Sequence, residues 1–206
     1  VEAASATFAW TLILGISNAL VMFAMPAISA YADLRAHKKG LLALSTVGCV
    51  VATAALAAVG PGDVAFAAVA IIASNFFFMT GVALIAAFLP ELARPAALGK
   101  VSGWGWGFGY VGGLITLGLC LAYVQWAQSR GAGAQQFVPV TMLITAAVFA
   151  VAAMPALLLL RERATPQAGA SVGHVLQQTL ARLAHTLRHI GRYRDFGWLL
   201  LCAVFY

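Results

Sequence analysis

The stretch VSGWGWGFGYVGG, residues 101–113, decides the fold, because its glycines allow two opposite interpretations. Residues 107–112, GFGYVG, have the G-x-G-x-x-G spacing of a dinucleotide-binding loop. That loop requires a preceding strand and an acidic residue about 20 positions further on. The residues before 101 form a loop, and no acidic residue follows until Glu162. The glycines therefore indicate a helix with bare backbone and not a nucleotide site.

Glycines four residues apart lie on one face of a helix. Gly105, Gly109 and Gly113 have this spacing, and Gly112 flanks them. Membrane helices associate through such small residues, because lipid is as apolar as leucine and close backbone approach supplies the packing energy instead. We therefore expect this glycine face to pack against another helix.

The composition places the whole chain in a membrane. Of its 206 residues, 63% are hydrophobic and 9% are charged, whereas a soluble domain has about 25% charged residues. The three cysteines all lie in apolar stretches. We expect free thiols and no disulfide framework.

Five apolar stretches are long enough for a helix that crosses the hydrocarbon core, which takes roughly 20 residues. They span residues 7–32, 40–60, 64–90, 103–127 and 137–160. A sixth begins near Trp198 and is cut short, and the chain starts without Met, so we expect part of a longer protein. None alternates like a membrane β-strand. The sequence predicts an all-α, polytopic membrane helix bundle with five complete transmembrane helices and a truncated sixth.

Basic residues gather on one side of this predicted bundle. Eleven of the twelve Lys and Arg residues follow the first, third and fifth stretches, and only Arg130 lies in the other connections. The positive-inside rule makes the basic side cytoplasmic. Topology thus accounts for the net charge of +6, which indicates no nucleic-acid partner. We expect a multi-pass protein of a bacterial inner (plasma) membrane, since the chain is rich in alanine.

The long connection over residues 161–197 contains one periodic segment. Its apolar residues recur at helical spacing, namely Val172, Val175, Leu176, Leu180, Leu183, Leu187 and Ile190. The pattern predicts an amphipathic cytoplasmic helix that lies along the membrane surface, with its arginines near anionic lipid. A linker helix packed on its own protein and a helix for a regulatory partner are the alternatives.

Charged residues cluster at the cytoplasmic ends of two predicted spans. The segment AYADLRAHKK, residues 30–39, holds a single acid ahead of four basic or imidazole side chains. Pro90 should stop the third helix, and a short turn beyond it should pair Glu91 with Arg94. A carboxylate at this depth is costly unless it is paired. We therefore predict a cytoplasmic gate made of Asp33, Arg35, Lys38, Lys39, Glu91 and Arg94.

Few polar side chains lie deep within the predicted spans. They are Ser17 and Asn18 in the first, Ser74, Asn75 and Thr80 in the third, and Tyr110 in the fourth. An asparagine amide is costly in lipid, so it should face another helix or a wet cavity. Hydrogen bonding between helices and contact with a solute are both open. The second and fifth spans hold nothing more polar than Ser, Thr and Cys, and we expect them to face lipid.

The sequence shows no constellation of catalytic or metal-binding residues. No Asp, Glu, Lys, Arg or His lies in the middle of a predicted span, where a proton relay would need one. His185 and His189 have metal-ligand spacing but no carboxylate or thiolate companion nearby. We expect no metal, no cofactor and no enzymatic activity.

The charged loop and the long connection together resemble the major facilitator superfamily, with one further span before the first stretch. DLRAHKK, residues 33–39, is similar to its loop motif D-R-x-G-R-R-K, with Leu34 in place of an Arg and Ala36 in place of the Gly. Pro26 resembles the kinking proline of its second span. The resemblance implies two six-helix halves around a central cavity.

Four further segments resemble, in order and spacing, the vacuolar amino-acid effluxer family linked to autophagy and its bacterial relatives. They are AAFLPELA (86–93), GKVSGWGWGFGYVGG (99–113), MPALLLLRER (154–163) and LLLCAVFY (199–206). The resemblance covers the chain. It implies an N-terminal half without its first helix over residues 1–160, a linker over 161–197 and the start of the C-terminal half over 198–206.

This resemblance implies a secondary transporter that moves a small solute, such as an amino acid, by alternating access. Residues facing the solute would be Ser74, Asn75, Thr80, Asn18 and Tyr110. Residues packing against the other half would be Gly105, Gly109, Gly112 and Gly113. We expect a monomer whose partners are the solute and the lipid bilayer. A non-transporting membrane scaffold or sensor and a membrane-embedded enzyme are the alternatives.

Overall fold

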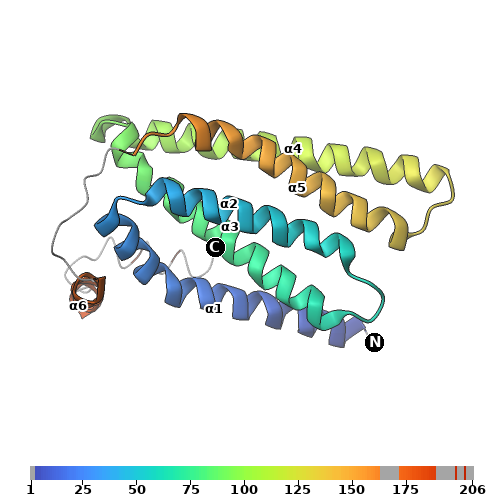
Figure 1. Cartoon of the computed structure of the whole chain (residues 1–206), viewed down its shortest axis with the longest axis horizontal. Coiled ribbons are helices and arrows are strands. Elements are labelled where there is room, and N and C mark those ends of the chain that lie inside the picture. The colour runs from blue at the N-terminus through green and yellow to red at the C-terminus, as the bar shows by residue number, and fades with distance from the viewer. Residues whose placement is uncertain (1–2, 163–171, 189–197, 199–201, 203–206) are drawn as a thin grey trace.

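The computed structural model describes residues 3–162, 172–188, 198 and 202, and all regular structure within them is helical. Five long helices run side by side (Figure 1): α1 (Ala3–Arg35), α2 (Lys38–Ala55), α3 (Val64–Leu92), α4 (Leu98–Ser129) and α5 (Ala134–Leu159). Two short 3-10 turns, η1 (Leu56–Ala58) and η2 (Pro95–Ala97), follow α2 and precede α4. A shorter helix, α6 (Val172–Arg188), comes last.

The five long helices coincide with the five predicted spans. Each is apolar and long enough to cross a membrane, so the predicted all-helical membrane bundle is confirmed. Pro90 does not stop α3, contrary to the prediction, because the helix continues to Leu92 and turns into an extended conformation at Ala93. Pro90 lies in the last turn of α3, where the loss of its own backbone N–H removes one hydrogen bond and only two helical residues follow. The predicted sixth span lies outside the described residues, apart from Trp198 and Cys202.

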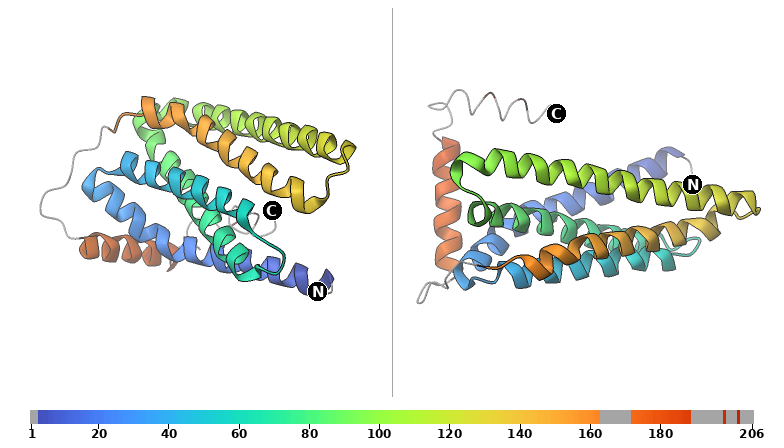
Figure 2. Two further views of the ribbon diagram at one scale, coloured as in Figure 1. Left: turned by 45° about the vertical axis from the view of Figure 1, so that its right-hand side comes forward. Right: turned by 90° about the horizontal axis from the view of Figure 1, so that it is seen from above.

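One end of the bundle is basic. At this end α1, α3 and α5 finish while α2 and α4 begin, and we call it the basic end. Its described Lys and Arg residues are Arg35, Lys38, Lys39, Arg94, Lys100 and Arg161. The helix α6 lies crosswise to the spans at the basic end, next to α1 (Figure 2). This placement suits both a membrane-surface helix and a linker helix packed on its own protein, and both stay predictions.

The helix α2 lies in the middle of the bundle, contrary to the expectation that it faces lipid. It packs against α3 and α5 and is the most buried of the five spans. Its small residues explain the packing, since Ser45, Cys49 and Ala52 are buried. A Cβ added to Gly48 would lie 2.7 Å from the ring of Phe77 in α3. The packed face of α2 is therefore marked by small side chains, whether apolar or weakly polar.

An apolar cluster fastens the bundle together at the basic end. Phe88 and Leu84 of α3 are 0% and 1% exposed, and they pack with Ala32 of α1 and Leu42 of α2. Leu157 and Leu160, at the end of α5, complete the cluster. Many small dispersion contacts thus hold the ends of four helices at one place.

Candidate functional site

Three polar side chains meet between α1 and α3 in the central part of both helices. The hydroxyl of Ser17 is fully buried, donates to the carbonyl oxygen of Ile72 at 3.3 Å and accepts from Nδ2 of Asn75 at 2.8 Å. The same Nδ2 atom donates to Oδ1 of Asn18 at 3.2 Å. We call Ser17, Asn18 and Asn75 the polar cluster. It places hydrogen-bonding groups at mid-depth of an apolar bundle.

The polar cluster offers one donor and one acceptor that no other described residue uses. Nδ2 of Asn18 and Oδ1 of Asn75 have no hydrogen-bond partner in the described part of the chain. Asn18 is exposed and Asn75 is half-buried, so a neighbouring group has access to both. An amide without a partner is costly in an apolar environment. The pair therefore suits a polar solute or a polar side chain of another helix.

The other predicted solute-binding residues do not join the polar cluster. Ser74 donates to the carbonyl oxygen of Ile71 at 3.0 Å, and Thr80 to that of Phe76 at 2.8 Å, so both hydroxyls bond their own helix. Tyr110 is 72% exposed on α4 and stacks near Trp106, with 6.5 Å between the ring centroids. The structure thus brings together Asn18 and Asn75 and adds Ser17, which the predicted site did not contain.

A charged network joins three elements at the basic end. Nζ of Lys38 lies 3.0 Å from Oε1 of Glu91, and these two side chains are only 11% and 19% exposed. The carboxylate of Glu162, just beyond α5, accepts the backbone N–H groups of Lys38 and Lys39 at 2.7 and 3.3 Å. These are the first N–H groups of α2, which have no partner within the helix.

Glu162 is therefore a cap for α2 supplied from a distant part of the chain. A negative charge at a helix N-terminus is favourable, because the helix dipole is positive there. The sequence prediction missed this residue. Its only signal in the sequence is an acidic side chain that directly follows an apolar span.

Arg35 and Arg94, two further residues of the predicted gate, stay apart from this network. Arg35 and Arg94 are exposed and form no ion pair with a described residue. The predicted pair of Glu91 with Arg94 is absent there, because Arg94 lies beyond the end of α3 in an extended conformation, with φ −68° and ψ 152°. Asp33 belongs to α1, but its side chain lies outside the described part of the structure.

The loop between α1 and α2 turns at Ala36, whose φ is 49°. This left-handed conformation suits glycine and is unfavourable for alanine, because the Cβ approaches the following carbonyl oxygen. Nδ1 of His37 lies 2.6 Å from the carbonyl oxygen of Arg35 and bridges the turn. The position is the one where the resembling loop motif has glycine. Ala36 thus adopts a conformation that glycine would adopt without strain.

The predicted packing glycines of α4 touch nothing in the described chain. A Cβ added to Gly105, Gly109, Gly112 or Gly113 would meet no atom within 4 Å. The aromatic residues between them, such as Trp104 and Tyr110, are 61% and 72% exposed. Packing of this face against another helix therefore concerns a partner beyond the described residues, and it stays a prediction.

No group of three or more metal-ligating side chains occurs among the residues that the structure describes. Of the two histidines with metal spacing, His185 is exposed on α6, and His189 lies outside the described residues. The arrangement of the site is one of hydrogen bonding and ion pairing.

Five helices that are apolar and long enough to cross a membrane, with a polar cluster at mid-depth and a charged network at one end, define a polytopic helical membrane protein. The chain belongs to the family described as "Vacuole effluxer Atg22 like", whose model matches residues 1–206. The resemblance seen in the sequence is confirmed. This is a family of major-facilitator-type membrane transporters and not of enzymes. No curated protein and no solved structure matches the chain.

Proposed function

We propose that the protein is a secondary transporter that moves a small polar solute, such as an amino acid, by alternating access. The polar cluster carries the proposal. An asparagine amide in the middle of a span is costly, and such residues commonly mark a solute pathway. Nδ2 of Asn18 and Oδ1 of Asn75 supply one donor and one acceptor to the solute. Ser17 positions Asn75 through its hydrogen bond at 2.8 Å.

At the basic end, the charged network divides the predicted gate into two parts. The Lys38–Glu91 pair and the cap from Glu162 join helices of one bundle, so these residues move together. Arg35 and Arg94 are exposed and remain available for ion pairs with a second bundle. In this proposal the basic end faces the cytoplasm of a bacterium, and the two arginines and Asp33 open and close that side.

Flux into vesicles that contain the full-length protein tests the proposed function. Radiolabelled amino acids are offered at low concentration to the wild type, to Asn18→Ala and to Asn75→Ala. One hydrogen bond to a solute is worth about 1 kcal/mol, so each variant should transport roughly fivefold more slowly. Thr141→Ala is the control, because its hydroxyl bonds only the carbonyl oxygen of Val138 in its own helix. Unchanged flux in both asparagine variants would contradict the assigned site.

The gate has a separate test in the same vesicles. Asp33→Asn combined with Arg94→Gln should change the rate of transport, because the cytoplasmic side can no longer close on its ion pairs. An unchanged rate would exclude the gate and leave the solute site untouched. A wild-type protein that moves no amino acid would favour the non-transporting scaffold. We propose a monomer as the working unit, which the mass of the protein–detergent complex checks.

A further inference from the structure

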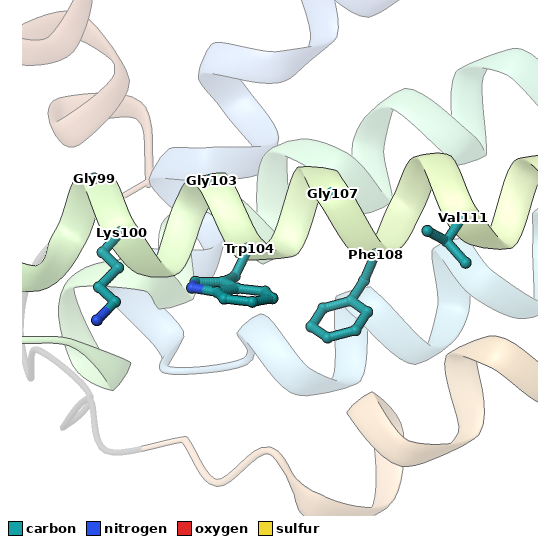
Figure 3. A pocket seen from close by; sticks show the side chains of 7 residues that line it. All are labelled: Gly99, Lys100, Gly103, Trp104, Gly107, Phe108 and Val111. Carbon is teal, nitrogen blue, oxygen red and sulfur yellow. The ribbon is translucent and has the colours of Figure 1, made fainter.

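We propose that the first half of α4 carries a binding site for one anionic glycerophospholipid, in the leaflet at the basic end. An open groove of about 510 Å³ runs along this part of α4 (Figure 3). Its floor is Gly99, Gly103 and Gly107, where an added Cβ would meet no atom within 4 Å. We call it the α4 groove.

Two aromatic rings form the wall of the α4 groove. Trp104 and Phe108 extend to the same side of α4 as Lys100 and Val111 (Figure 3). Their ring centroids are 5.7 Å apart with the planes tilted by 30°, so they line up along the helix. Flat rings beside bare backbone give an apolar surface for a straight hydrocarbon chain. Lys100 is the only charged residue in the lining, which does not suit a solute with several polar groups.

The length of the α4 groove matches one leaflet. Gly99 and Val111 mark its two ends, and a helix rises 1.5 Å per residue, so the groove extends over roughly 18 Å. The hydrocarbon core of a bilayer is about 30 Å thick. An occupant that follows the groove from the membrane surface therefore ends near the middle of the bilayer, as the acyl chain of a phospholipid does.

The charge of the α4 groove lies at its surface end. Lys100 is in the first turn of α4, is exposed and has no ion pair among the described residues. The first turn of a membrane-spanning helix is at the membrane surface, so we infer that its ammonium group is near the lipid phosphates, where a lysine attracts anionic lipid. Trp104, one turn deeper, is of the residue type that prefers the border between headgroups and hydrocarbon. An anionic headgroup above an acyl chain satisfies both features.

The α4 groove and the predicted helix-packing face lie on two different glycine rows of α4, with an aromatic row between them. Glycine and aromatic residues alternate from Gly103 to Tyr110, so rows of residues four apart are alternately bare and aromatic. The row of Gly105 and Gly109 leads back to Val101, which carries no charge. That row suits another helix, whereas the row beside Lys100 suits an anionic lipid.

Photo-crosslinking of the full-length protein tests this site. The protein is placed in nanodiscs of phosphatidylcholine with a small amount of phosphatidylglycerol that carries a diazirine on its acyl chain. A matched disc holds diazirine phosphatidylcholine instead. Peptide mapping should find labelling within residues 99–111, about fivefold stronger for phosphatidylglycerol, which is the expected gain from one lysine near the membrane surface.

Variants separate the headgroup contact from the groove itself. Lys100→Gln should make the two probes label equally, while Lys100→Arg keeps the preference for phosphatidylglycerol. Gly103→Leu with Gly107→Leu fills the groove and should abolish labelling, whereas Gly118→Leu, at an open position of the same helix, should not. Equal labelling of the wild type by both probes would overturn the site as ordinary bulk lipid. Protection of residues 99–111 from both probes would overturn it in favour of a covering protein helix.

Discussion

Lys38 interacts with two acidic residues at the basic end, one through its side chain and one through its backbone. Its ammonium group pairs with Glu91, and its backbone N–H donates to Glu162. The lysine side chain is only 11% exposed, and a charge removed from water in this way needs a partner. The sequence could predict that Lys38 lies at the basic end of a span. It placed Glu91 in the same predicted gate but did not predict Glu162, which lies 124 positions away in the chain.

Ala36 is a residue at which a substitution should stabilise the protein. Its left-handed φ of 49° is strained for alanine and not for glycine. After the entropy of glycine in the unfolded chain is subtracted, Ala36→Gly should raise the free energy of unfolding by about 0.5–1 kcal/mol. Thermal unfolding in detergent measures the change. Ala122→Gly, inside α4, should act in the opposite direction by about 1 kcal/mol, and destabilisation by both changes would contradict the strain at Ala36.

At the scale of the helices, the sequence predicts how many spans there are better than how they pack. Long apolar stretches identify all five, because any helix that crosses lipid must be long and apolar. The prediction that α2 faces lipid was wrong. It rested on the lack of strongly polar residues, whereas the packed face of α2 consists of small residues such as Ser45, Gly48 and Ala52. Packing between membrane helices depends on shape, and a single sequence does not show which small residue meets which ring.

The contact between α2 and α3 is sensitive to one added methyl group. A Cβ on Gly48 would lie 2.7 Å from the ring of Phe77, so the ring or the helix must move. Gly48→Ala should lower the free energy of unfolding by about 1–3 kcal/mol, as overpacking does elsewhere. Unfolding in detergent followed by circular dichroism measures the loss. A second change, Phe77→Leu, should restore most of it, and Gly118→Ala in open space should show none.

The start of α2 should loosen when its cap is removed. Glu162→Ala leaves the first N–H groups of α2 without their acceptor, which should cost about 1 kcal/mol locally. Hydrogen exchange over residues 38–41 should then become several-fold faster, while exchange in α4 stays the same. Arg161→Ala is the matched control, because this exposed neighbour does not contact α2 through a hydrogen bond. Equal exchange in both variants would show that the cap contributes nothing.

At the scale of the whole molecule, the family could be recognised from the sequence, whereas the side chains that meet between the helices could be predicted only in part. The polar cluster combines Asn18 and Asn75, both predicted, with Ser17. Ser74 and Thr80 were predicted from polarity alone, and both hydroxyls bond their own helix instead. A serine or threonine can satisfy itself within a helix, so its polarity is weak evidence for a solute. An asparagine amide has two groups to satisfy and is the stronger signal.

The glycine face of α4 should matter for transport and not for folding. A Cβ added to Gly105, Gly109 or Gly113 would meet no atom within 4 Å in the described chain, so we expect larger side chains there to leave its fold intact. If this face rocks against a second bundle, Gly109→Leu should lower flux at least tenfold with an unchanged unfolding temperature. Measuring flux and the unfolding temperature on the same preparation separates an effect on transport from an effect on folding. Gly118→Leu is the control, and full flux in Gly109→Leu would exclude the pivot.

The polar cluster also has a consequence for how the chain enters the bilayer during synthesis. α1 emerges from the ribosome well before α3, so Asn18 arrives without the amide that later meets it. Until α3 is inserted, the amide of Asn18 needs hydrogen-bond partners from the insertion machinery or from water. A nascent chain halted after α2 should therefore be held at the translocon longer than the same chain with Asn18→Leu. We therefore expect the hydrogen bond between Asn18 and Asn75 to form only after α3 has been inserted.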